Sequence, residues 1–260
     1  MNNRRRKQLT EGQIAQQPSW APNDRITFSA ADCDDSCWSQ LFYVDRNANN
    51  QVLVSGNDSY HLFHPTWSPD GQRIAAAALG RGIFSVSKDG RTTRRLTKGG
   101  SDEAPEWSPR GDWIAYDKRV RDTNYDVFAV NAGTRQVRRL TRDPRQQTNP
   151  TWSPDGSRFA FAEQQTDGKW AIVTLRTDGT DRRRVTAKGI SAQEPAWSPD
   201  GTRIAFVKQG LDEASIAVVP EAGGPVRTVT PKSLFASTPA WSPDGESIAF
   251  SGQPVERDSG

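Results

Sequence analysis

The sequence has 260 residues, of which 34% are apolar, and its formal net charge is +3. The longest run of small apolar residues is 74–79, far shorter than a bilayer requires, so no membrane-spanning helix is predicted. Residues 4–7 are basic but no apolar segment follows them, and therefore no secretion signal is predicted within this chain.

A short motif, P-x-W followed by a Pro-Asp-Gly turn, recurs six times along the chain. Its tryptophans are Trp20, Trp67, Trp107, Trp152, Trp197 and Trp241, separated by 47, 40, 45, 45 and 44 residues. Pro presets φ, Asp can bond its own backbone and Gly accepts positive φ, so the turn joins two strands tightly. A repeat of this period with β-type content predicts a propeller with about four strands per blade.

Three further strand patterns accompany the motif, the first in six units and the other two in five. After the turn, large apolar residues lie two apart in six segments: 25–28, 73–76, 113–116, 158–161, 203–206 and 247–250. A third apolar stretch follows in five units: 41–44, 83–86, 127–130, 171–174 and 216–219. A fourth short strand ends in an apolar residue and a hydroxyl: 54–55, 96–97, 140–141, 185–186 and 229–230. The period of two indicates strands throughout.

The two ends of the chain bear on how the ring closes. Residues 7–10 repeat the fourth-strand pattern before the first tryptophan, which predicts that 5–10 form the closing outer strand of the Trp241 blade. The segment 252–260 that follows Ser251 is polar and contains Pro, so it makes a poor third strand. We therefore expect an all-β, six-bladed propeller spanning 1–260 as a single domain, with an incomplete last blade, in a fragment of a longer protein. A closed but imperfect last blade is the alternative.

The basic residues lie where a structural role is expected. Arg94-Arg95, Arg138-Arg139 and 182–184 fall on the predicted outermost strands, where charge discourages edge-to-edge pairing. No aromatic platform is interleaved with them, so no nucleic-acid partner is predicted.

Two cysteines, Cys33 and Cys37, lie in a predicted loop of the first blade. They could form a small disulfide, worth about 2 kcal/mol in the loop-entropy model, or remain free thiols. The only histidines, His61 and His64, lie in another linker, so no zinc site is expected. The acidic residues 32, 34 and 35 lack the alternation of a calcium loop. We predict no metal and no cofactor.

Catalytic motifs are missing from the sequence. It contains no G-x-S-x-G elbow, no H-E-x-x-H, no phosphate-binding glycine loop and no dinucleotide fingerprint. The Asp and Gly of the turn recur in nearly every unit, as a structural turn predicts and a unique active site does not. We therefore predict no catalytic residue and a protein that is not an enzyme.

The phrase P-x-W-S-P-D-G-x-x-I-A-F, preceded by R-R-L-T, resembles the repeat of TolB-type β-propellers over essentially the whole chain. The first copy departs from it, with Ala21 and Asn23-Asp24 in place of Ser and Asp-Gly. Similar repeats occur in TolB, in propellers fused to prolyl-oligopeptidase-like serine peptidases, and in bacterial sensory and surface proteins. The sequence shows no counterpart of the additional α/β domain of TolB, so the resemblance is to the propeller superfamily and not to TolB itself.

The residues immediately before each blade proline are expected to ring the mouth of the central channel and to contact a partner. They are Gln17, His64, Ala104, Asn149, Glu194 and Thr238. The loops 30–39, 118–125 and 163–169 vary in length and charge on the same face, and variable loops on a rigid scaffold commonly carry function.

These features lead to one hypothesis and two alternatives. We expect a monomeric, non-enzymatic module that binds a protein or peptide on its loop face in the bacterial envelope, periplasmic or otherwise extracytoplasmic. The first alternative is the substrate-gating propeller of a prolyl-oligopeptidase-like serine peptidase lacking its catalytic domain. The second is a carbohydrate-active propeller with a metal at the channel mouth.

Overall fold

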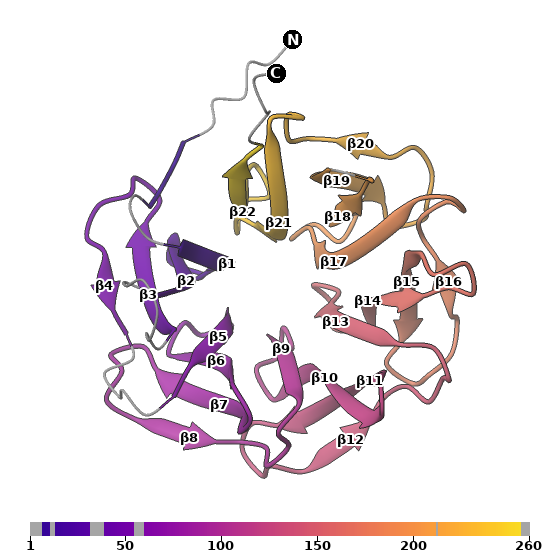
Figure 1. Ribbon diagram of the computed structural model, residues 1–260. Helices are drawn as coiled ribbons and strands as arrows, with labels where there is room; N and C mark the ends of the chain where they lie inside the picture. The colour runs from indigo at the N-terminus through magenta and orange to yellow at the C-terminus, as the bar shows by residue number, and fades with distance from the viewer. Residues whose placement is uncertain (1–6, 11–13, 32–38, 55–59, 212, 256–260) are drawn as a thin grey trace.

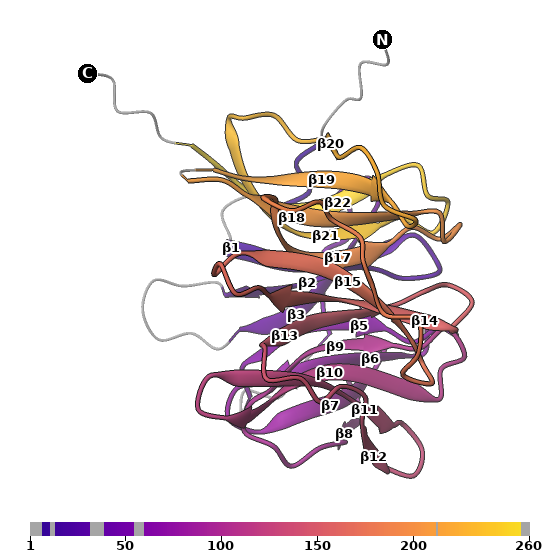
Figure 2. The same cartoon turned by 90° about the vertical axis from the view of Figure 1, so that its right-hand side faces the viewer.

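The computed structural model describes residues 7–10, 14–31, 39–54, 60–211 and 213–255. Every regular element in these ranges is a β-strand, and the strands form antiparallel sheets arranged radially around a central axis (Figure 1). Seen from the side, the strands are stacked across the body in successive sheets (Figure 2). The described part of the chain contains no long apolar helix of the kind that crosses a bilayer.

Five sheets have four strands each, and they follow one another along the chain. The first consists of β1 (Ile14–Trp20), β2 (Arg25–Ala31), β3 (Gln40–Asp45) and β4 (Val52–Leu53). The second consists of β5 (Leu62–Trp67), β6 (Arg73–Ala78), β7 (Gly82–Ser87) and β8 (Thr93–Arg95). The third consists of β9 (Asp102–Trp107), β10 (Trp113–Arg121), β11 (Asn124–Asn131) and β12 (Val137–Arg139).

The fourth and fifth sheets have the same order of strands. The fourth consists of β13 (Gln147–Trp152), β14 (Arg158–Gln164), β15 (Trp170–Arg176) and β16 (Arg183–Arg184). The fifth consists of β17 (Ser191–Trp197), β18 (Arg203–Gln209), β19 (Ala214–Pro220) and β20 (Arg227–Thr228). The last sheet has only two strands, β21 (Leu234–Trp241) and β22 (Ile248–Pro254).

The β-propeller class is thus confirmed, but the count of six blades is wrong. The structure has five four-stranded blades, and the Trp241 repeat forms a two-stranded sheet. The reason is the one expected for an incomplete last blade: the polar sequence after Ser251 continues β22 and adds no third strand among the described residues.

The N-terminal segment 7–10 is not assigned to a strand, and residues 5–6 lie outside the described residues. Leu9 nevertheless packs against the apolar cluster of the first blade, which includes Ile26, Phe28 and Val44, and Ala249 of β22 packs against the same cluster. The role of 5–10 as a closing outer strand stays a prediction, as does the extent of the domain.

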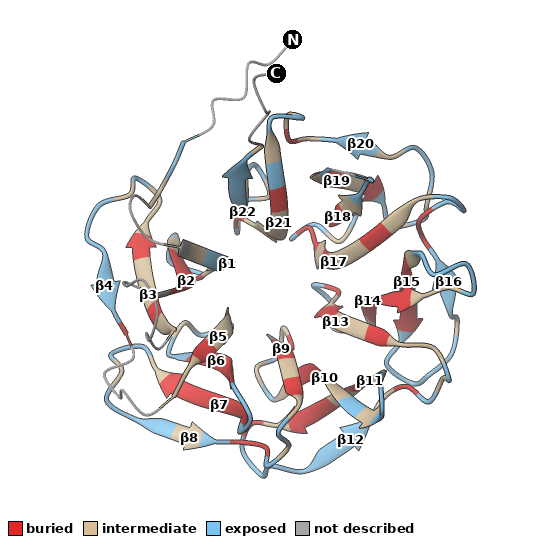
Figure 3. Cartoon of the chain, in the orientation of Figure 1, coloured by how far each residue is buried: buried red, intermediate tan, exposed pale blue. Residues whose placement is uncertain are grey.

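The core is divided among the blades and not gathered at one centre. Buried residues concentrate on the second and third strands, whereas the fourth strands are exposed (Figure 3). One cluster joins Ala160 and Ile172 of the fourth blade to Trp197, Ile204 and Val219 of the fifth. Since neighbouring blades share each cluster, a modest apolar fraction suffices for the whole ring.

The repeated tryptophans lie at these blade interfaces. Trp67, Trp107 and Trp197 are buried, and Trp20, Trp152 and Trp241 are half-buried. The Trp67 indole Nε1 donates a hydrogen bond to Thr27 Oγ1 of the first blade over 2.6 Å, and Trp241 Nε1 donates to the Ala196 carbonyl over 3.1 Å. Each of these bonds ties a blade to the one before it.

The serine of the S-P-D-G turn organises the turn through its hydroxyl. In the fifth blade Ser198 is fully buried, its Oγ lies 2.5 Å from Asp200 Oδ1, and it accepts the N–H of Arg203 over 3.0 Å. Hydrogen bonds from the Ser198 hydroxyl and from the backbone N–H of Thr202 lower the pKa of Asp200 to about 2, so this carboxylate is ionised at neutral pH. The same Ser–Asp contact recurs in the turns of Ser68, Ser153 and Ser242.

Replacing Ser198 with alanine should therefore destabilise the protein by about 1–3 kcal/mol, because the Arg203 N–H would lose its acceptor in a buried position. Urea unfolding would measure the loss. Ser157→Ala, which removes an exposed turn hydroxyl, is the control and should change stability by less than about 0.5 kcal/mol. Equal effects of the two substitutions would contradict this role of the buried serine.

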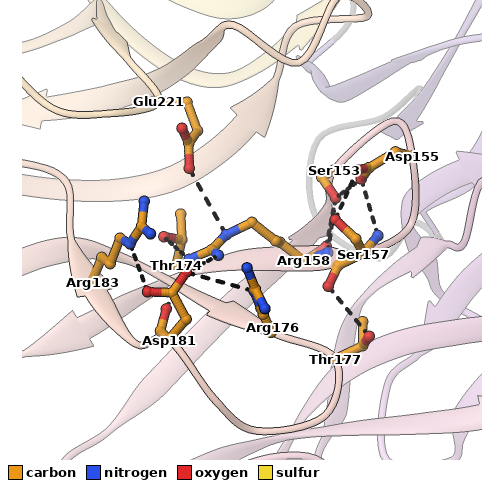
Figure 4. Close-up of polar contacts among 10 residues, drawn as sticks. All are labelled: Ser153, Asp155, Ser157, Arg158, Thr174, Arg176, Thr177, Asp181, Arg183 and Glu221. Carbon is orange, nitrogen blue, oxygen red and sulfur yellow. Dashed lines mark hydrogen bonds and ion pairs between the residues drawn. The ribbon is translucent and has the colours of Figure 1, made fainter.

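The outer arginines engage carboxylates. Figure 4 shows Arg158 of β14 reaching Asp181, with Nη1 at 2.7 Å from Oδ2, and Thr174, with Nη2 at 3.1 Å from Oγ1. Arg183 binds the other oxygen of Asp181 at 2.7 Å. Arg139 pairs with the buried Asp126 and Arg182 with the buried Glu163. Arg139, Arg182 and Arg183 thus serve as counter-ions within their own blades, whereas Arg94 of the second blade donates to the carbonyls of Ala132 and Gly133 in the third.

Candidate functional site

All six residues that precede a blade proline line one cavity in the central channel, which has a volume of about 250 Å³. Each stands at a bulge in the first strand of its blade, where the register with the second strand shifts. The following proline lacks an N–H for the ladder, so the bulge costs no strand hydrogen bond at that residue.

The backbone of these six residues is left-handed. Their φ values are 56° at Gln17, 52° at His64, 45° at Ala104, 53° at Asn149, 51° at Glu194 and 49° at Thr238. Asn tolerates this region, whereas for the β-branched Thr238 it is a true outlier. Strain of this kind persists only where the surroundings hold it, and here the bulge and proline of every blade do so.

Side chains of the ring connect neighbouring blades on one side of the channel. Gln17 Oε1 accepts the N–H of His64 over 2.8 Å and the Ser29 hydroxyl over 2.9 Å. This fixes the amide so that Gln17 Nε2 donates to His64 Nε2, 3.0 Å away. His64 is therefore neutral with its proton on Nδ1, and burial lowers its pKa to about 4.

A second connection runs from the fifth blade through the last sheet to the first blade. Glu194 Oε2 accepts the N–H of Thr238 over 2.6 Å, and the Thr238 hydroxyl lies 2.8 Å from Ser251 Oγ. Ser251 Oγ also accepts the N–H of Gln17 over 3.0 Å, which links the last sheet to the first blade. Burial raises the pKa of the Glu194 carboxyl above its usual value.

Two acidic residues of this region were not predicted. Glu106 lines the cavity and accepts the Thr66 hydroxyl over 3.0 Å, and burial raises its pKa to about 7. Asp117 is buried behind the ring, accepts the N–H of Asn149 over 2.9 Å, and burial likewise raises its pKa to about 7. Burial thus favours the neutral form of both carboxyls more than in an exposed Asp or Glu.

The repeat itself held a signal for both residues. At the position of Glu106 the other copies have Ser19, Thr66, Thr151, Ala196 and Ala240, all small. At the position of Asp117 the other copies have Ser29, Ala77, Ala162, Val207 and Ser251. A single charged residue in a column of small or apolar ones is a departure from the pattern; Glu106 lines the cavity, and Asp117 contacts the ring from behind through the N–H of Asn149.

The cavity extends from the ring toward the S-P-D-G turns, since its lining continues to Trp20, Trp197, Pro199 and Trp241.

Of the predicted partner loops, 118–125 is largely a hairpin extension of β10 and β11, and 163–169 comprises the end of β14 and the turn to β15. Residues 32–38, with Cys33 and Cys37, lie outside the described residues. Within the described ranges, no group of three or more His, Cys, Asp and Glu side chains is placed to hold a metal ion.

A family model described as the TolB beta propeller domain matches residues 100–259, more than half of the chain. The chain belongs to the TolB beta propeller domain family. The resemblance found in the repeats is thereby confirmed, although no curated protein matches the chain in sequence, so it is not identified as TolB itself.

Solved structures show the same fold for this TolB-type propeller. A protein assigned as TolB from Agrobacterium tumefaciens superposes with a TM-score of 0.79 at 22% identity, over 94% of this chain and 91% of that one. TolB from Acinetobacter baumannii gives 0.68 at 17% identity, over 83% and 56%. A puromycin-hydrolyzing peptidase of Mycobacterium tuberculosis gives 0.64 at 12% identity, over 92% and 43%.

Proposed function

We propose that this TolB-type propeller is a non-enzymatic module that binds a protein or peptide through the ring of residues before its blade prolines. The observation that carries this proposal is that Gln17, His64, Ala104, Asn149, Glu194 and Thr238 come from six separate repeats and line a single cavity. The ring is rigid, because bulges, prolines and hydrogen bonds between blades hold it, and rigid concave sites reduce the entropy lost on binding.

The chemistry of the ring suits a polar, extended polypeptide. Neutral His64, the carboxyls of Glu106 and Glu194, and the amide of Asn149 offer donors and acceptors, while the ring prolines and Trp20 offer apolar surface. No hydrogen bond to the Asn149 carboxamide is found among the described residues, so this group is available to a ligand. The absence of a nucleophile motif from the sequence supports a binding role over a catalytic one.

The remaining parts of the proposal follow from the TolB-type resemblance. We place the protein in the bacterial cell envelope, periplasmic or otherwise extracytoplasmic, and we expect the isolated chain to be a monomer. The variable loops at the end of the channel opposite the S-P-D-G turns would contact the body of the partner, and the cavity would receive its extended segment.

A second candidate is the propeller of a prolyl-oligopeptidase-like serine peptidase without its catalytic domain. The observation in its favour is that 92% of this chain superposes on 43% of the M. tuberculosis peptidase. Such a propeller would admit substrate to a neighbouring catalytic domain and would have no retained partner of its own.

The test is selection of peptides from a displayed random library against the purified chain, followed by titration of one selected peptide. Asn149→Gly keeps the left-handed backbone but removes the amide, and with Glu194→Gln it should weaken binding at least tenfold. The melting temperature should change little for Asn149→Gly alone, and Arg91→Ala, an exposed outer position, should leave affinity unchanged.

Hydrolysis of peptide or ester substrates by the chain would contradict the non-enzymatic proposal. Failure of the ring variants to affect binding, or an effect of Arg91→Ala instead, would contradict the assignment of the ring. Selection of no peptide at all would favour the gating propeller over the binding module.

A further inference from the structure

Buried carboxylates in the blades of this propeller have basic partners of their own. Three such groups are found: Asp102 with Lys118, Asp126 with Arg139, and Glu163 with both Arg145 and Arg182. The three carboxylate side chains are almost completely buried, so each cation replaces the solvation that its carboxylate loses on folding. This is the usual arrangement, because an unpaired charge is costly to remove from water.

The two glutamates of the channel cavity differ from these carboxylates. Glu106 and Glu194 form no ion pair with the described residues, and burial raises the pKa of both with no basic group to oppose it. The residues that line the cavity include no lysine and no arginine, and His64 among them is kept neutral by burial. The cavity is therefore acidic and lacks a counter-charge, in a chain whose net charge is +3.

Each of these two carboxyls has one oxygen held in place and one oxygen free. Glu106 Oε2 accepts the Thr66 hydroxyl over 3.0 Å, and Glu194 Oε2 accepts the N–H of Thr238 over 2.6 Å. No hydrogen bond to either Oε1 atom is found in the part of the chain that the structure describes, and neither atom is excluded from solvent. Both oxygens can thus be reached from the cavity, in positions that neighbouring blades fix.

Most backbone donors of the ring are already used within the protein. The N–H groups of Gln17, His64, Asn149 and Thr238 donate to Ser251 Oγ, Gln17 Oε1, Asp117 Oδ2 and Glu194 Oε2, respectively. A ligand that accepts hydrogen bonds would find none of these four N–H groups free. A ligand that donates them would find the free oxygens of the two glutamates, and a positive charge on it would supply the counter-charge that they lack.

The tryptophans of the cavity favour a planar cation. The guanidinium carbon of Arg46 lies 5.2 Å from the ring centroid of Trp20, and that of Arg203 lies 4.7 Å from the ring centroid of Trp241. Trp197 lines the same cavity on the strand that carries Glu194, but within the described ranges no cation lies over its ring. A guanidinium stacks on aromatic rings and donates several hydrogen bonds to carboxylates, so it suits a wall of this composition.

We propose that the channel cavity binds an arginine side chain of the partner polypeptide, with Glu106 and Glu194 as its counter-charges and Trp197 as an aromatic wall. The inference rests on the proposed binding function of the ring and adds the side chain that the ring selects. The strands β9 and β17, which carry the two glutamates, both border the central axis (Figure 1). A bound guanidinium would favour the ionised form of both carboxyls, which burial alone disfavours.

The probe for this site is Nα-acetyl-arginine methylamide, titrated into the full chain and followed by NMR. We expect saturable binding that shifts the indole N–H signals of Trp20 and Trp197, but not that of Trp113, which lies outside the cavity lining. The matched control compound is Nα-acetyl-citrulline methylamide, which has nearly the same shape without the charge. It should bind about tenfold more weakly, because a charge-assisted hydrogen bond is replaced by a neutral one.

Charge-removing variants assign the binding to the two glutamates. Glu106→Gln can still accept the Thr66 hydroxyl, and it should weaken binding of the arginine compound about fivefold while leaving the citrulline compound unaffected. Glu194→Gln, which can still accept the N–H of Thr238, should have the same effect and gives an independent measurement if the first variant fails to fold. Glu213→Gln makes the same change at an exposed residue outside the cavity lining and should alter neither affinity.

The outcomes separate this inference from the proposed function, because the two compounds need no partner polypeptide. Equal binding of the arginine and citrulline compounds, or unchanged binding of the arginine compound by both glutamate variants, would overturn the arginine site. Selected peptides that bind through the ring but contain no arginine would also overturn it, and would leave the proposed function standing. Charge-dependent binding of the arginine compound would support the site even if no peptide were selected.

Discussion

Replacing Trp67 with alanine is expected to lower the free energy of unfolding by about 3–5 kcal/mol, the range found for large-to-small changes of buried aromatic residues. Trp67 is 6% exposed and packs with Leu62, Ile74 and Phe84 in the cluster between the first and second blades. Its indole also satisfies Thr27 Oγ1, which is buried and would lose its donor. Urea unfolding of the full chain would measure the change.

Trp113 provides a matched control for this experiment, since it is a tryptophan outside the repeated motif. It is half-buried at the start of β10, and the Arg138 guanidinium lies 4.4 Å from its ring centroid. An exposed cation–π contact contributes about 0.5–1 kcal/mol, so Trp113→Ala should cost far less than Trp67→Ala. Similar losses for the two would show that the repeated tryptophans are not the main ties between blades.

The repeat predicted the strands correctly because the turn motif, the alternation of apolar residues and the apolar–hydroxyl pair all indicated the same strand boundaries. The alternation in 203–206 became β18, and the pair Val229-Thr230 follows β20. The predicted number of blades was wrong because each repeated tryptophan marks only the first strand of a unit. It does not show that the other three strands of the blade are present. Trp241 begins a unit whose third strand is absent from the described chain, and only the pairing of β22 with a single neighbour reveals this.

The six residues before the blade prolines could be predicted to lie around the channel, but Glu106, which also lines the cavity, and the properties of these residues could not. The residue before each proline could be read from the motif, but its left-handed backbone could not, because it arises from a bulge that depends on pairing with the second strand. Glu106 and Asp117 acquire their raised pKa values from burial by neighbouring blades, far away in sequence. Such tertiary desolvation leaves no periodic trace in the chain.

Two cavity-lining residues should give this propeller opposing pH dependences of stability. The pKa of Glu106 rises from 4.5 to about 7 on folding, so the native state binds more protons between those values and its stability falls as pH rises. The pKa of His64 falls from 6.5 to about 4, so the unfolded state binds more protons there and stability falls as pH drops. At about 1.4 kcal/mol per pKa unit, and allowing for partial solvation, each effect amounts to about 2–3 kcal/mol.

Neutral substitutions should separate the two effects. Glu106→Gln can still accept the Thr66 hydroxyl, so its unfolding free energy relative to the parent should grow by about 2–3 kcal/mol between pH 4.5 and 8. His64→Gln should gain a similar amount in the reverse direction, between pH 6.5 and 4. Asp178→Asn is the control, because Thr180 lowers the pKa of that exposed carboxyl and its difference from the parent should be constant above pH 5.

Asp117, buried beside the ring with a pKa also near 7, would remain in both variants, so its contribution cancels in each difference from the parent. If the Glu106→Gln difference were flat across the pH range, the carboxyl would have to be ionised in the folded channel, and the burial of the ring would be less complete than its geometry requires.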